Sequence, residues 1–242
     1  MKKIVGWLAI SFVITTSFSG CATLKELGLI PSQFEMVAGL KDALSQGMFA
    51  SFSAFANPQA NPVLQFAFPG DAAKIEKTLR DLGLGPLVDK TTGKLTKAMG
   101  DAVVAAKPIF LNSIKQMSIG DALGILVTDN PHAATDYFKR VNTPLLMAAF
   151  RPIVDSTVKT DNIDTDWKRI TTVYNAIPFS NQKLETNLAD FLAARAIDGM
   201  CLVIEKEEEK IRTQYAFRKT DMMKKAFGYA EMEMKRRAMM GK

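Results

Sequence analysis

The sequence predicts an all-α protein, folded as a single compact helical bundle with at most one short strand or extended segment. Apolar residues recur at spacings of three and four along most of the chain, and capping residues precede many of these runs. The chain has 242 residues, of which 48% are hydrophobic and 23% are charged, as is usual for a globular protein with an ample core. No internal repeat, low-complexity tract or clear linker divides it.

The first half of the chain is expected to hold helices interrupted by one extended segment. Ser32 is a candidate N-cap for the first of these helices. Residues 63–69 alternate in a way that favours an extended segment or one short strand. Asp71 is the expected cap of the next helix, and helical spacing then continues over residues 87–117, with a break at Pro108.

The middle of the chain carries three further helix-start signals. Ser118 and Asp121 resemble a capping box, with Asp in place of the usual Glu. Asn130-Pro131 and Thr143-Pro144 each resemble a cap followed by a first-turn proline. The sequence therefore predicts separate helices after each of these signals, and a kink near Pro152 in the last of them.

The last third of the chain is expected to form three helices. The first opens at Asp164 or Thr165, the second is long and spans about Leu184 to Arg212, and the third runs from about Thr220 to Met239.

Residues 1–21 have the features of a bacterial lipoprotein signal. Lys2 and Lys3 precede a fifteen-residue apolar run, residues 4–18, which is too short to span a bilayer as a stable helix. The run leads into Ser19-Gly20-Cys21, which resembles the lipobox, whose cysteine is lipidated on its thiol and becomes the mature N-terminus. The alternative is a plain secretory signal cut near Ala22.

The lipobox interpretation sets the expected organisation and location of the protein. Residues 1–20 are the signal peptide, residues 21–31 the lipidated tether and residues 32–242 the helical domain. The mature chain would keep 29 basic and 25 acidic residues, a mild balance of +4 that suits anionic lipid head groups and demands no nucleic acid. Ala22 after the cysteine resembles the pattern sorted to the outer membrane, so we expect a lipid anchor in its inner leaflet, facing the periplasm.

The sequence lacks the motifs of the common metal, nucleotide and hydrolase sites, such as CxxC, HExxH, GxSxG and Walker A. His132 is the single histidine, and Cys201 has no cysteine partner once Cys21 is acylated. We therefore expect no metal site, no cofactor and no catalytic constellation, and we expect Cys201 to be a buried, inert thiol.

Glu207 is the candidate ligand-binding or ion-pair residue. At about 100° per residue it falls within the apolar stripe of the long helix, near Met200 and Ile204, whereas Glu208 and Arg212 fall on the opposite side. A buried carboxylate needs a partner or a proton, so the functional interpretation places Glu207 in a pocket. The alternative is that the helix end is already exposed to solvent there.

The last helix is basic and rich in methionine, which makes it a candidate face for a membrane or a partner protein. The residues of this face are Met223, Lys224, Lys225, Phe227, Met234 and Arg236. The alternative is a final core helix that ends in a basic tail.

Several segments, taken in order, resemble the DUF4197 family. They are Met117-Ser118-Ile119-Gly120-Asp121-Ala122 with Ile125-Leu126, then Ala133 to Phe138, Phe150 to Val154, Glu208 to Arg212, and Phe227-Gly228. The resemblance covers roughly Leu40 to Gly228 and implies a bacterial exported or lipid-anchored protein. It implies no catalytic residue, because the function of the family is unknown.

These observations predict a cell-envelope lipoprotein that works as a non-enzymatic binding or interaction module. Its partners would be the membrane, through the anchor at Cys21, and either an apolar ligand or another envelope protein. The alternative is an enzyme that acts on an envelope component, with Glu207 or Asp121 as acid or base. Asp121 is more simply explained as a helix-start residue.

Overall fold

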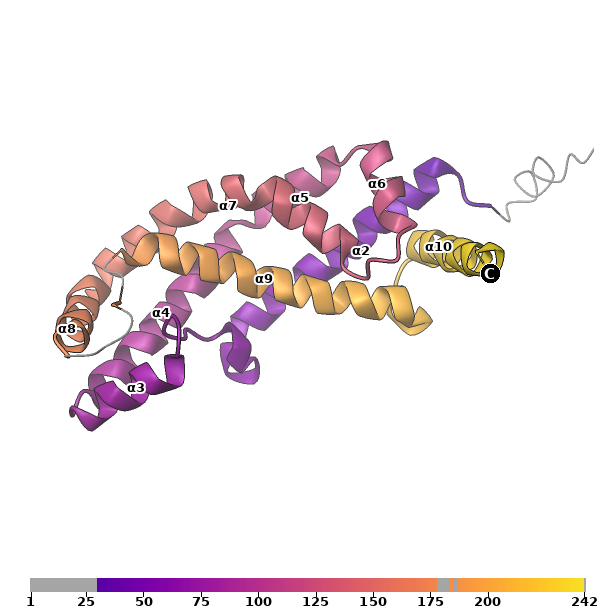
Figure 1. Cartoon of the computed structure of the whole chain (residues 1–242). Coiled ribbons are helices and arrows are strands. Elements are labelled where there is room, and N and C mark those ends of the chain that lie inside the picture. Colours follow the sequence, from indigo (N-terminus) through magenta and orange to yellow (C-terminus); the bar gives the residue numbers. More distant parts are fainter. Residues whose placement is uncertain (1–29, 178–182, 185–186, 242) are drawn as a thin grey trace, which may run out of the picture.

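All regular structure in the described residues, 30–177, 183–184 and 187–241 of the computed structural model, is helical, which confirms the predicted fold class (Figure 1). The α-helices are α2 (Gln33–Ala56), α3 (Ala72–Asp81), α4 (Gly85–Ala105), α5 (Lys107–Gln116), α6 (Ile119–Leu126), α7 (Ala133–Thr160), α8 (Ile163–Asn175), α9 (Leu188–Thr213) and α10 (Asp221–Met240). Short 3-10 turns, η1 to η3, lie at Pro58–Ala60, Pro62–Leu64 and Tyr215–Phe217. The predicted signal peptide, Cys21 and most of the predicted tether lie outside the described residues.

Three long helices, α2, α7 and α9, run through the middle of the molecule and pack on one another together with α4 (Figure 1). Helices α3 and α8 lie at one end of this assembly, and α6 and α10 lie at the other. None of the described helices is long and apolar enough to cross a membrane.

Residues 63–69 form no strand in the structure. Leu64, Phe66 and Phe68 are buried, so their alternation reflects burial on one side. The segment pairs with a side chain instead of a neighbouring strand, since the Phe66 N–H donates to Thr96 Oγ1 at 2.9 Å. Phe68 stacks on Trp167 of α8, with ring centroids 5.8 Å apart. The segment therefore begins in η2 and continues to α3 as irregular backbone packed on the core.

Helix α7 runs without interruption through Pro144 and Pro152, so the prediction of a new helix at Thr143-Pro144 is wrong. Its buried residues keep a spacing close to four along the whole helix: Ala134, Thr135, Phe138, Asn142, Leu146, Phe150, Val154 and Val158. Because this continuous stripe packs against α9 and α4, tertiary burial outweighs the local cost of the prolines.

Most predicted caps are confirmed, but the start of α7 differs from the prediction. Ser32 forms a full capping box with Glu35, and Asp71, Ser118 and Thr220 each accept the expected backbone N–H. Asn130-Pro131, however, lies ahead of the helix, which begins at Ala133 without a capping side chain at its N-cap residue, His132. The N-terminal N–H groups of α7 consequently need an acceptor from elsewhere in the fold.

Helix α10 packs antiparallel along the first half of α2. Thr220 Oγ1 donates to Asp42 Oδ2 at 2.7 Å, and Lys225 pairs with Glu35 at 2.6 Å. Between these two contacts Gly39 allows a close approach, because a Cβ atom built there would lie 2.4 Å from the carbonyl oxygen of Met222. This packing brings the start of α10 against α2 and α9, where Glu207 lies.

Candidate functional site

Glu207 lies at a groove that α2, α9 and the start of α10 form together. Helix α2 presents Asp42, Ser45, Gln46, Phe49 and Ala50, which follow the spacing of one helical face. Glu207 comes from α9, and Lys219, Thr220 and Met223 come from the beginning of α10 and the residue ahead of its cap. The groove has a volume of about 520 Å³.

The carboxylate of Glu207 is largely shielded from solvent and bound on both oxygens. Its side chain is 12% exposed. Gln46 Nε2 donates to Glu207 Oε1 at 2.8 Å and to the backbone oxygen of Phe217 at 3.0 Å. Lys210 Nζ lies 3.3 Å from Glu207 Oε2 and also covers the ring of Phe217. The structure thus places Glu207 between the two interpretations, as an ion-paired carboxylate at the edge of a groove.

The rest of the groove combines an apolar lining with acceptor oxygens. Met223 is buried beneath it, and Phe49 is half exposed at its edge. Asp42 accepts from Thr220, while Gln46 Oε1 is buried and has no hydrogen-bond partner among the described residues. The oxygens of Glu207, Asp42 and Gln46 lie near two cations, Lys219 in the lining and Lys210, which pairs with Glu207. This arrangement can hold an apolar group that ends in an N–H donor or a positive charge.

Glu208, assigned to the polar side of α9 from the helical spacing, is in fact buried, so that assignment is wrong. Its side chain is 5% exposed. Glu208 Oε1 accepts from the Ala134 N–H at 2.9 Å, and Oε2 accepts from the Thr135 N–H and hydroxyl at 2.9 and 2.7 Å. The carboxylate therefore supplies the N-terminal acceptor that α7 lacks.

Arg212 pairs with Glu208 and binds the C-terminus of α6, whereas Glu208 binds the N-terminus of α7. Its guanidinium lies 2.8 Å from Glu208 Oε1 and is 6% exposed. It also donates to the backbone oxygens of Ile125 and Leu126, at the C-terminus of α6. The ion pair thus joins the end of α6 to the start of α7, with each charge at the helix end that favours it. The signal for this site was the Glu208–Arg212 spacing of four just ahead of the end of α9.

Asp121 acts as a helix-start residue and not as a partner of Glu207. The Ser118 hydroxyl donates to Asp121 Oδ2 at 2.5 Å, and the Tyr137 hydroxyl donates to the same atom at 3.1 Å. The hydrogen bond from Ser118, with a further contribution from Tyr137, lowers the pKa of Asp121 below its usual range. Asp121 is thus a weak base at the start of α6, whereas Glu207 lines the groove beside α2.

The predicted face on the last helix is divided by the fold. Met223 and Phe227 are buried in the core, at 1% and 2% exposure, and so do not belong to an exposed face. Lys224 pairs with Asp221, and Lys225 pairs with Glu35 of α2. Met234 and Arg236 lie further along α10, where the side chain of Arg236 is 58% exposed. The structure separates a buried proximal half of α10 from an exposed distal half.

Two further residues singled out from the sequence are Cys201 on α9 and His132 at the start of α7. Cys201 is buried, and burial raises the pKa of its thiol to about 11, so it stays protonated and unreactive at neutral pH. His132 Nε2 lies 3.5 Å from Glu205 Oε1. Among the described residues no group of three or more His, Cys, Asp or Glu side chains is arranged to hold a metal ion.

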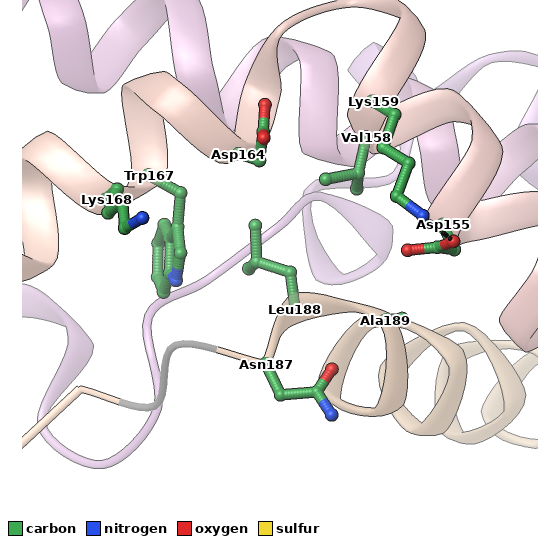
Figure 2. A pocket seen from close by; sticks show the side chains of 9 residues that line it. All are labelled: Asp155, Val158, Lys159, Asp164, Trp167, Lys168, Asn187, Leu188 and Ala189. Carbon is green, nitrogen blue, oxygen red and sulfur yellow. Dashed lines mark hydrogen bonds and ion pairs between the residues drawn. The ribbon is translucent and has the colours of Figure 1, made fainter.

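A second, smaller cavity lies where α7, α8 and α9 meet (Figure 2). Its volume is about 260 Å³, and Figure 2 shows Leu188 between Trp167 and Val158 in its apolar part. Lys159 at its edge is paired with Asp155 at 2.6 Å. This cavity has about half the volume of the groove beside Glu207.

Comparisons with known proteins identify a family. Residues 31–228 match the family described as "Protein of unknown function (DUF4197)". No curated protein and no solved structure gives a significant match. The match covers the capping box of α2, the Glu207 groove, the Glu208–Arg212 pair and the proximal half of α10. The chain belongs to the DUF4197 family.

Proposed function

We propose that this protein is a cell-envelope lipoprotein, anchored through Cys21, that works as a non-enzymatic binding module facing the periplasm. The supporting observation is the groove beside Glu207, in which a shielded carboxylate borders an apolar lining. Its ligand would be a small apolar molecule with an N–H or cationic end, held by the oxygens of Glu207, Asp42 and Gln46.

Binding is favoured over catalysis by the environment of the two candidate acids. Glu207 is held between Gln46 and Lys210, and Asp121 is held by Ser118 and Tyr137 at a helix start. Proton transfer at neutral pH needs a group whose pKa lies at about 7. The hydrogen bonds on Asp121, that from Ser118 first, lower its pKa and so move it further from this range.

Native mass spectrometry of the protein purified from its own cells tests the groove. We expect wild type to carry an extra mass that organic extraction removes, and Glu207→Gln to retain it at about tenfold lower occupancy, because a hydrogen bond to a charged group contributes roughly 1.5–3 kcal/mol. Ala50→Phe should carry little of the extra mass, because the larger side chain would fill part of the groove that Ala50 lines. Glu209→Gln, at an exposed position on the same helix, is the matched control. A clean apo mass for wild type would make Glu207 a structural ion-pair residue.

Labelling cells with a radioactive fatty acid tests the anchor. We expect the wild-type protein to incorporate the label and Cys21→Ala to incorporate none, because the lipobox cysteine is the acceptor of the lipid. Cys201→Ala is the matched control and should label as wild type does, since Cys201 is buried within the helical domain. Equal labelling of wild type and Cys21→Ala would rule out the lipoprotein assignment and favour a plain secretory signal.

A further inference from the structure

The distal half of α10 exposes methionines beyond the protein core. Ala230 is the last buried residue of the helix, and residues 231–240 are all half-buried or exposed. Met232, Met239 and Met240 are 53%, 75% and 65% exposed, which places them among the most exposed large apolar side chains of the described residues. On the surfaces of globular proteins such side chains usually occur singly. Three exposed methionines on one short helical segment therefore indicate a binding surface.

These methionines share one face of α10 with a cation. At about 100° per residue, positions 232, 236, 239 and 240 fall within about 100° of one another on the helix surface. Arg236 therefore lies among the three methionines, with Lys235 and Arg237 on either side. A helix face of apolar side chains bordered by lysine and arginine is typical of helices that lie in a membrane interface.

The charges of this segment are arranged with the cations outermost. Lys235, Arg236 and Arg237 have side chains that are 67%, 58% and 61% exposed. The two carboxylates that pair with them lie closer to the protein, with Glu233 at 14% and Glu231 at 44% exposure. Glu231 also pairs with the buried guanidinium of Arg218, which holds it toward the core. The outer surface of the segment is therefore positive and complements an anionic surface.

The position of the segment in the fold adds a second argument. Because α10 runs antiparallel to α2, with Lys225 opposite Glu35, its distal half extends past the start of α2. Figure 1 shows the yellow end of α10 and the indigo start of α2 at the same end of the molecule. Phe34, in the first turn of α2, is 78% exposed there. Cys21 precedes Ile30 by nine residues, which reach at most about 30 Å, so an anchor at Cys21 would keep this end near the bilayer.

We propose that the distal half of α10 (residues 231–240) binds the surface of an anionic lipid bilayer through Met232, Arg236, Met239 and Met240. A helical segment about 15 Å long and about 10 Å wide is too small to supply the roughly 800 Å² per partner of a stable protein interface. Shallow insertion between lipid head groups does not require a buried area of this size. The inference deepens the proposed anchoring at Cys21, and it concerns a contact that α10 makes by itself.

Flotation with lipid vesicles tests this contact without the anchor. The unlipidated chain from Ala22 to Lys242, which keeps every described residue, is mixed with phosphatidylcholine vesicles that contain or lack phosphatidylglycerol. We expect it to float with the anionic vesicles only, and less so at high salt. Arg236→Gln combined with Arg237→Gln should lower the partition coefficient about thirtyfold, because each basic residue near an anionic surface contributes about 1 kcal/mol. Met232→Gln, Met239→Gln and Met240→Gln together should lower it by at least as much.

Val104→Gln combined with Leu145→Gln is the matched control, because both side chains are more than half exposed on other helices. This control should float as wild type does, and circular dichroism melting should show all variants folded. Wild type that stays unbound, or methionine variants that float equally well, would overturn the proposal. A dimer in native mass spectrometry that the methionine substitutions abolish, without vesicle binding, would instead assign the face to a second copy of the chain. Fatty-acid labelling of Cys21 and occupancy of the Glu207 groove are read independently, so failure here leaves both unaffected.

Discussion

Replacing Glu208 with alanine is expected to lower the free energy of unfolding by about 3–5 kcal/mol, the usual cost of breaking a buried ion pair from one side. The substitution leaves the guanidinium of Arg212 buried over the ring of Phe227, with the carbonyl oxygens of Ile125 and Leu126 as its acceptors and no charge opposite it. It also leaves the N–H groups of Ala134 and Thr135 without their acceptor at the start of α7. Urea denaturation followed by circular dichroism measures the change.

Glu209→Ala is the control for this prediction, because Glu209 is exposed on the same helix, and it should change stability by no more than about 0.5 kcal/mol. The loss of stability in Glu208→Gln should lie between those of Glu208→Ala and Glu209→Ala. An amide keeps one acceptor oxygen for α7 but loses the charge that faces Arg212. A loss below about 1 kcal/mol for Glu208→Ala would mean that water or a shifted Arg212 replaces the carboxylate, and that the pair does not join α6 to α7.

Gly39→Ala is expected to destabilise the protein by about 1–3 kcal/mol, although alanine is the better helix former by about 1 kcal/mol. The new methyl group would lie 2.4 Å from the carbonyl oxygen of Met222 and 2.5 Å from the Cβ atom of Ala226. Both are fixed parts of α10, so the helix has to move away from α2. The contact between Lys225 and Glu35 and the groove beside Glu207 depend on this packing.

The matched control is Gly228→Ala in α10 itself, where an added Cβ atom meets nothing within 4 Å. It should leave stability unchanged or raise it by up to about 1 kcal/mol. Thermal melting of both variants gives the comparison, and a stability for Gly39→Ala equal to that of Gly228→Ala would contradict the close approach of α2 and α10.

Local chemistry explains what was predictable about the fold. Ser32, Asp71, Ser118 and Thr220 cap their helices as expected, because each cap depends only on residues within one turn. Pro144 misled the prediction for the opposite reason. Its local signal marks a helix start, but the buried stripe of α7 continues on both sides of it and is satisfied only by packing against α9 and α4.

The candidate site shows the same division. The apolar stripe of α9 drew attention to Glu207, and the structure places this carboxylate beside α2, largely shielded and paired with Lys210. The prediction assumes that the helix has one buried face, so it assigns Glu208 to the side exposed to solvent. Helix α9 packs on α7 as well as α2, and Glu208 faces the N-terminus of α7.

The sequence by itself determined the helical class, most helix starts and the family, because capping, periodicity and ordered motifs act over a few neighbouring residues. Only the tertiary structure decided that Gln46 would meet Glu207, that Arg212 would close the joint between α6 and α7, and that α10 would divide into a buried and an exposed half. Those outcomes depend on which helices pack together, and contacts between residues 86 to 161 positions apart leave no local pattern in the chain.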